Sequence, residues 1–153
     1  MVVTPPFIVW SEIFAVGHRE LDAEHRRLVD TINEIHSAER AGQTPDQLRP
    51  MLNALFVAAE QHFEHENSVM RKIRPAASAY ETPRRDHLAL SSEAIDEHID
   101  AHERELSTLR SIIGSIGPRT DPAEPKLSHE LRHWFVEHSI KYDAHLKMVF
   151  QSI

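Results

Sequence analysis

The stretch LNALFVAAEQHFEHENSVM, residues 52–70, is the part of this 153-residue chain that best indicates its fold. Its apolar side chains recur at intervals of three and four residues, and a histidine and a glutamate continue the same helical face: Leu52, Leu55, Ala59, His62, Glu66 and Met70. Ionisable groups directed at a core require charge partners or a metal ion. The stretch therefore predicts an amphipathic helix that carries polar chemistry into the interior.

Three other stretches show the same periodicity and are separated by glycine and proline, which is typical of helix ends. Thr82 and Pro83 read as a cap residue followed by proline at the first helical position. The expected helices cover about residues 20–41, 45–73, 82–116 and 126–149. After a short N-terminal arm, four such helices predict an all-α, up-down-up-down four-helix bundle, formed by one domain over residues 1–153.

Composition excludes several classes of protein. The net charge is −7 and no segment concentrates basic residues, so we expect no nucleic-acid partner. No apolar run approaches the ~20 residues of a membrane span, and the first residues lack the features of a signal peptide. We therefore expect no membrane association and a bacterial cytoplasmic location. The absence of cysteine excludes disulfides, zinc ribbons and iron–sulfur clusters.

Histidine is unusually frequent, with 12 in the chain, and some histidines have the spacing of metal ligands. His62 with Glu66, and His98 with His102, are i,i+4 pairs that leave one face of a helix. Imidazole and carboxylate without thiolate suit iron, manganese or zinc. The sequence therefore predicts a metal site in the bundle.

The candidate ligands also lie at one level of the expected bundle. On each of the four helices, one candidate lies 13 to 17 residues from the loops at one end of the bundle: His25, His62, His102 and His138. At a rise of ~1.5 Å per residue, their heights in the bundle agree within about one helical turn. His87, the other candidate on the third helix, would lie about 20 Å out of level. The level count therefore favours His98 and His102.

Four motifs in this order resemble the bacteriohemerythrin family. They are VGHRELDAEHRRL (16–28), HFEHENSVM (62–70), HIDAHERELSTL (98–109) and WFVEHSIKYD (134–143). The resemblance covers nearly the whole chain. Single motifs of this kind are weak evidence, but four in the family's order are specific.

The resemblance implies a non-heme diiron centre, with two iron ions bridged by an oxo or hydroxo group and dioxygen as ligand. It assigns His98, His102 and His138 to one iron and His25 and His62 to the other. Glu66 and Asp143 would bridge the two irons. Dioxygen would take the open position on the iron held by two histidines. The role of Asp143 rests mainly on the resemblance, because a spacing of i+5 turns it ~140° around a helix from His138.

The chain departs from the family pattern in ways that remove no ligand. Glu24 stands in place of a glutamine, Asn67 of a glutamate and Ser139 of an isoleucine. Residues 71–97 form a longer segment than in the family, and we expect it to extend the third helix or to pack as a lid. An alternative alignment through His87 would lose one ligand, because the residue four positions on is a serine.

The remaining histidines are not expected to be primary ligands: His18, His36, His65, His87, His129, His133 and His145. Helical spacing places His36 and His145 on inward faces, where core or supporting roles are open to them. Five apolar residues are candidates for the wall of a dioxygen pocket, although the same spacing also fits ordinary core: Leu21, Leu28, Leu55, Ala59 and Leu106.

The leading functional hypothesis is a protein that is not an enzyme and binds dioxygen reversibly, for storage, delivery or sensing. A diiron enzyme acting on peroxide, nitric oxide or an organic substrate is the first alternative. Glu130 and His133 form the one Glu-x-x-His motif, where ferritin-like oxidases have two, which disfavours that class. The second alternative is a metal-binding sensory or partner-binding bundle whose output surface is residues 71–97.

Overall fold

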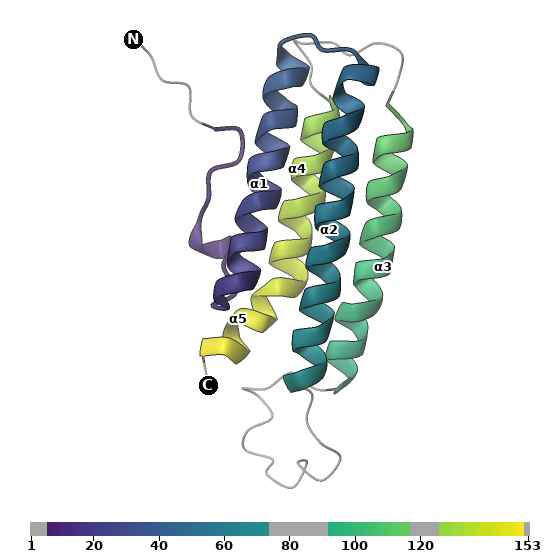
Figure 1. The fold of residues 1–153 in the computed structure, drawn as a ribbon. Helices are drawn as coiled ribbons and strands as arrows, with labels where there is room; N and C mark the ends of the chain where they lie inside the picture. The colour runs from purple at the N-terminus through teal and green to yellow at the C-terminus, as the bar shows by residue number, and fades with distance from the viewer. Residues whose placement is uncertain (1–5, 74–91, 117–125, 152–153) are drawn as a thin grey trace, which may run out of the picture.

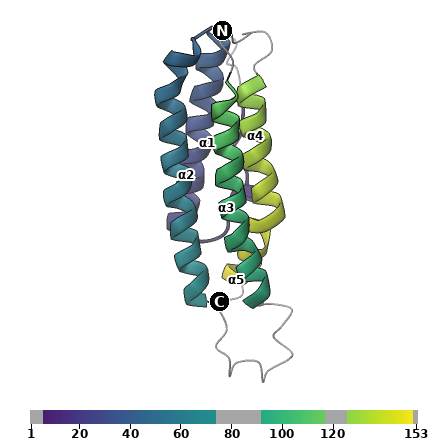
Figure 2. The same ribbon diagram turned by 90° about the vertical axis from the view of Figure 1, so that its right-hand side faces the viewer.

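The computed structural model describes residues 6–73, 92–116 and 126–151, and its long helices lie side by side (Figure 1). The helices are α1 (Arg19–Arg40), α2 (Pro45–Ile73), α3 (Ser92–Gly114) and α4 (Lys126–His138). α1 and α3 each pack against both α2 and α4, which closes the bundle (Figure 2). The predicted all-α, up-down-up-down bundle is confirmed. Among the described helices, none is long and apolar enough to cross a bilayer.

The turn from α1 to α2 is specified by local sequence. Gly42 takes a φ of 81°, a left-handed conformation that glycine adopts without steric cost. Thr44 and Gln47 then form a reciprocal cap, in which the Thr44 hydroxyl accepts from the Gln47 amide at 3.2 Å and the Gln47 side chain accepts from the Thr44 amide at 2.8 Å. These contacts explain why the predicted end of α1 and the predicted start of α2 agree with the structure within one residue.

The N-terminal arm runs along α1 and is fastened to it (Figure 1). The Asn33 side chain accepts from the Ile8 amide at 2.7 Å and donates to the Ile8 carbonyl at 3.0 Å. The arm then forms a short 3₁₀ helix, η1 (Glu12–Phe14), whose Phe14 is buried in the main core. The predicted arm therefore places a backbone segment beside the N-terminal part of α1.

The expectation of one regular helix over residues 126–149 was wrong. α4 ends at His138, the chain continues as a π-helical segment, η4 (Ser139–Asp143), and α5 (Ala144–Gln151) follows. A π-helical turn has i→i+5 hydrogen bonds and contains more residues than an α-helical turn, so side chains beyond it leave on a different face from the one expected.

The expected third-helix start at Thr82–Pro83, most of the segment 71–97, and His87 lie outside the described residues. Within them, α3 contains both His98 and His102.

The core has two apolar clusters with a polar layer between them. The main cluster includes Leu28, Leu55 and Leu131, and the smaller one is formed by Val16, Leu21, Met70, Ile95 and Leu146. Between these clusters, each of the helices α1 to α4 contributes at least one buried histidine, and Glu66 and Asp143 add buried carboxylates. The bundle therefore encloses ionisable groups between apolar layers that keep water away from them.

Candidate metal centre

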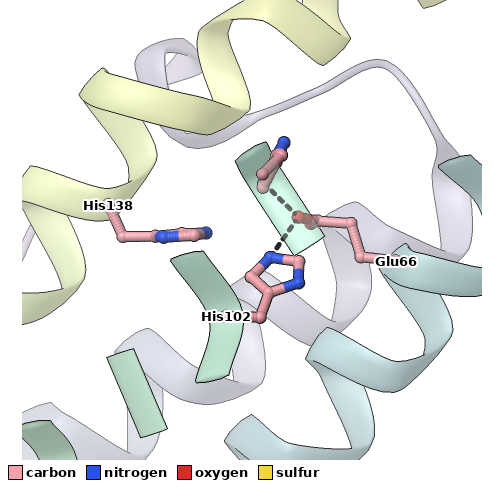
Figure 3. A group of neighbouring side chains, drawn as sticks. Glu66, His102 and His138 are labelled. Carbon is pink, nitrogen blue, oxygen red and sulfur yellow. Dashed lines mark hydrogen bonds and ion pairs between the residues drawn. The ribbon is translucent and has the colours of Figure 1, made fainter. Parts of the chain in front are cut away.

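The structure brings together all seven residues that the sequence proposed as ligands. Each is at most 4% exposed: His25, His62, Glu66, His98, His102, His138 and Asp143. They come from α1, α2, α3, α4 and the end of η4. Figure 3 shows Glu66 and His102 directed at each other from α2 and α3, with His138 projecting toward them from α4.

Glu66 divides its two carboxylate oxygens between two groups of histidines. Its Oε1 lies 2.9 Å from His98 Nε2 and 3.0 Å from His102 Nε2. Its Oε2 lies 3.2 Å from His62 Nε2 and 3.9 Å from His25 Nε2. The carboxylate therefore connects the α3 side of the centre with the α1 and α2 side.

Asp143 divides its oxygens in the same way. Its Oδ1 lies 3.2 Å from both His98 Nε2 and His138 Nε2, and its Oδ2 lies 3.1 Å from His25 Nε2. The cluster thus has two halves that share both carboxylates. We call them the three-histidine subsite (His98, His102, His138) and the two-histidine subsite (His25, His62).

The donor atoms have the character of ligands rather than of ordinary ion pairs. Several are buried and, among the described residues, form no well-aligned hydrogen bond: the Nε2 atoms of His62, His98 and His138, Glu66 Oε2 and both Asp143 oxygens. Buried polar atoms without partners are costly. Two groups of residues each have ligand atoms within 4.8 Å of one another: Glu66 with His98, His102 and His138, and Glu66 with His25 and His62. The residues fit a pair of cations bound by nitrogen and oxygen.

Burial opposes charge on these groups, and close opposite charges overcome it at most of them. Contacts with Glu24 and Glu66 raise the pKa of His62 to about 10, and contacts with Asp143 and Glu66 raise the pKa of His98 to about 9. Burial would raise the pKa of Glu66, but contacts with His102, His62 and His98 hold it well below its ordinary value. Burial dominates at His102 and lowers its pKa to about 4. Without metal, protons therefore occupy part of the cluster.

Contacts at the outer nitrogens orient three of these rings. His25 Nδ1 lies 2.6 Å from the Phe14 carbonyl oxygen, His62 Nδ1 lies 2.8 Å from Glu24 Oε1, and His102 Nδ1 lies 2.6 Å from Asn67 Oδ1. A histidine that donates from Nδ1 presents the lone pair of Nε2 to the centre. In the sequence Glu24 and Asn67 stood out only as departures from a pattern. Their adjacency to His25 and Glu66 is the signal that could have identified them.

Of the other histidines that the structure describes, none joins the cluster. His36 is half-buried, stacks on Phe7 with ring centroids 3.8 Å apart, and contacts the Ser128 hydroxyl at 2.9 Å. His145 is exposed, so the expectation of an inward position was wrong. Glu130 and His133 are exposed, away from the centre. His65 does not reach the centre but contacts Glu24.

The candidate pocket walls lie on both sides of the polar layer. Leu28, Leu55 and Ala59 belong to the main cluster and Leu106 packs against it, whereas Leu21 belongs to the smaller cluster.

A four-helix bundle with a buried layer of histidines and of carboxylates that lie between them defines a metal-binding bundle protein. The family model described as the hemerythrin HHE cation-binding domain matches residues 16–147. The chain therefore belongs to the hemerythrin family. Among curated proteins no match was found.

Proposed function

We propose that this protein binds two iron ions in its cluster and takes up dioxygen reversibly, as a store, carrier or sensor rather than as an enzyme. The observation that supports this most is the division of both carboxylates, Glu66 and Asp143, between two groups of histidines. A carboxylate with one oxygen toward each half is arranged to bridge two cations.

The donor set suits iron, manganese or zinc, and we propose iron because the family that the four sequence motifs resemble has a diiron centre. Five imidazoles and two carboxylates suit borderline cations, and the two negative charges offset only part of the charge of two divalent ions. A shared hydroxide would offset more. A ferrous pair held by these residues would supply the electrons for dioxygen binding.

The two subsites offer unequal numbers of protein donors. The three-histidine subsite has three imidazoles and an oxygen from each carboxylate, whereas the two-histidine subsite has two imidazoles and an oxygen from each. With one protein donor fewer, the two-histidine subsite would leave room for an external ligand on the metal that it would hold. We propose that dioxygen binds there.

Aromatic rings and the apolar layers shield the cluster from water. Phe63 stacks on His102 with ring centroids 4.2 Å apart and an interplanar angle of 7°, and Phe135 lies edge-on to His25 at 5.8 Å. Exclusion of water protects a reduced centre from side reactions, which reversible binding requires.

The test is anaerobic reconstitution with ferrous iron, followed by visible spectra during addition and removal of dioxygen. Charge-transfer bands that appear and disappear reversibly are expected. Irreversible bleaching with turnover of peroxide, nitric oxide or an organic substrate would support the diiron enzyme instead. Failure to take up iron would contradict both. His98→Ala should abolish or halve iron uptake, whereas His133→Ala, at a side chain 79% exposed, should not change it.

A further inference from the structure

We propose that Glu24 is a positioning residue that sets the metal affinity of the two-histidine subsite by holding His62 in place. This inference rests on the proposed function, because it assumes that the cluster binds two metal ions. It assigns a role to a carboxylate that lies outside the ligand cluster itself.

The geometry shows one carboxylate contacting two histidines across a helix interface. Glu24 belongs to α1, and both of its histidine partners belong to α2. Its Oε1 lies 2.8 Å from His62 Nδ1 and its Oε2 lies 2.9 Å from His65 Nδ1. With both oxygens engaged, the carboxylate cannot rotate away from His62 without losing a second contact.

The contact determines how His62 faces the centre. When Nδ1–H donates to Glu24, Nε2 is directed at the cluster, where it lies 3.2 Å from Glu66 Oε2. A carboxylate acceptor also makes the imidazole a stronger electron donor to a metal than a neutral acceptor does. Glu24 therefore acts on both the position and the basicity of His62.

The outer contacts of two other proposed ligands are different. His25 Nδ1 contacts the carbonyl of Phe14, and His102 Nδ1 contacts the amide oxygen of Asn67. Both acceptors are neutral. The negative charge of Glu24 thus acts on the two-histidine subsite, while Asn67 acts on the other. The asymmetry places the charged contact beside the metal position proposed for external ligands.

The surroundings of Glu24 extend this arrangement to the surface. His65 is 30% exposed and its Nε2 lies 3.6 Å from Glu20 Oε2, while His62 is 1% exposed. His65 is thus placed to hold the second oxygen of Glu24 without entering the cluster. A substitution of His65 would therefore remove one of the two contacts that hold the Glu24 carboxylate while leaving every proposed ligand in place.

The experiment is calorimetric titration of the metal-free full-length chain with Zn²⁺, which has no redox chemistry to complicate the result. Wild type is expected to bind two equivalents in two resolvable steps. His25→Ala identifies the step that belongs to the two-histidine subsite. Glu24→Ala should weaken that step by roughly 10–100-fold and leave the other step unchanged. Asn67→Ala, the matched control, should weaken the other step instead.

The conservative variant separates positioning from charge. In Glu24→Gln, the amide oxygen can still accept from His62 while the amide group donates to His65 in its other tautomer. E24Q should therefore recover most of the zinc affinity lost in E24A. If E24A does not fold, His65→Gln should weaken the same zinc step by a smaller factor.

Unchanged zinc binding by E24A would overturn the inference, as would an equal weakening of both steps, which would indicate a general structural role. If wild type itself binds fewer than two zinc ions, the proposed dinuclear function fails and the inference fails with it. The wild-type isotherm therefore distinguishes the two failures.

Discussion

Asp143 Oδ1 lies 3.2 Å from His138 Nε2, although Asp143 is five positions further along the chain. In a regular α-helix that spacing would turn the carboxylate ~140° away from the histidine. The π-helical segment Ser139–Asp143 contains more residues in its turn and brings Asp143 back to the face of His138. Such segments are rare and frequently occur at functional sites. Here the π-helical turn places the second carboxylate that lies between the two groups of histidines.

Asp143→Asn is expected to impair the binding of two metals. The amide retains one oxygen donor but loses the charge and the second oxygen, so it cannot bridge both subsites. The loss of affinity for at least one metal should exceed the roughly 10–100-fold typical of losing a hydrogen-bond partner of a ligand. Metal content after reconstitution and dialysis measures this, with Asp100→Asn at an exposed position of α3 as the control. Two metals retained in D143N would contradict the bridging role.

The metal-free protein should lose stability as the pH rises through the range in which His62 and His98 lose their protons. Their pKa values are raised from 6.5 to about 10 and about 9 in the folded state. The stability that these groups contribute is fully present below pH 6.5 and is lost as the pH rises through those folded values. Glu66 has the opposite dependence, because its pKa is lowered from 4.5 and its contribution is lost as the pH falls.

Thermal unfolding of the chelator-treated protein from acid to alkaline pH tests these signs. The melting temperature should be highest at a pH that lies between the ordinary pKa of a carboxylate and the ordinary pKa of a histidine. Zinc should flatten the alkaline decline, because the metal replaces the protons on His62 and His98. Calorimetry in buffers of different ionisation enthalpy should accordingly detect proton release on zinc binding at neutral pH. A metal-free protein that becomes more stable toward pH 9 would contradict the assignment.

Most of the fold could be predicted because periodicity and capping are local properties. Thr44 and Gln47 specify the start of α2 by bonding to each other, so the sequence carries that boundary. The π-helical turn has no comparable signature. Because periodicity does not show where such a turn changes the helical face, the sequence placed both His145 and Leu146 inward. In the structure Leu146 is buried, as expected, but His145 is exposed.

The proposed ligands were predicted more completely than the residues that support them. His98 and His102 share one helix, so a spacing of four residues was enough to place them together. Glu24 acts through His62 and His65 on another helix, and Asn67 acts through His102. Those contacts depend on how helices are rotated against each other, which periodicity alone does not determine.

Ser139→Ala is expected to leave the protein as stable or make it more stable. The Ser139 hydroxyl is 1% exposed and has no hydrogen-bond partner in the part of the chain that the structure describes. Removing a buried, unpaired hydroxyl can increase the free energy of unfolding by about 1 kcal/mol. Urea denaturation of the metal-free protein measures the change, with Ser107→Ala at an exposed position as the control. A clear loss of stability in S139A would indicate that the hydroxyl has a partner after all.

Glu39→Ala should destabilise the bundle strongly without involving the metal centre. Glu39 belongs to α1 and is 2% exposed, and its carboxylate caps the start of α4. Its Oε2 accepts from the Leu127 amide at 3.2 Å, while Oε1 accepts from the Ser128 amide at 3.0 Å and the Ser128 hydroxyl at 2.7 Å. The negative charge also lies at the positive end of the α4 dipole. Loss of these contacts leaves buried amides without their acceptor, so we expect a loss of about 2–3 kcal/mol in the free energy of unfolding.

Urea denaturation with chelator present isolates this effect from metal binding. Glu34→Ala, at an exposed position on α1, should change the free energy of unfolding by less than about 0.5 kcal/mol. The loss in free energy of unfolding for Glu39→Gln should lie between the losses for E39A and Glu34→Ala. The amide oxygen can accept one of the hydrogen bonds, but the amide N–H groups face the remaining donors. The portion of E39A that remains folded should still bind two zinc ions, since Glu39 contacts none of the proposed ligands in the hydrogen bonds described. An E39A midpoint equal to that of wild type would show that the helix cap contributes nothing to stability.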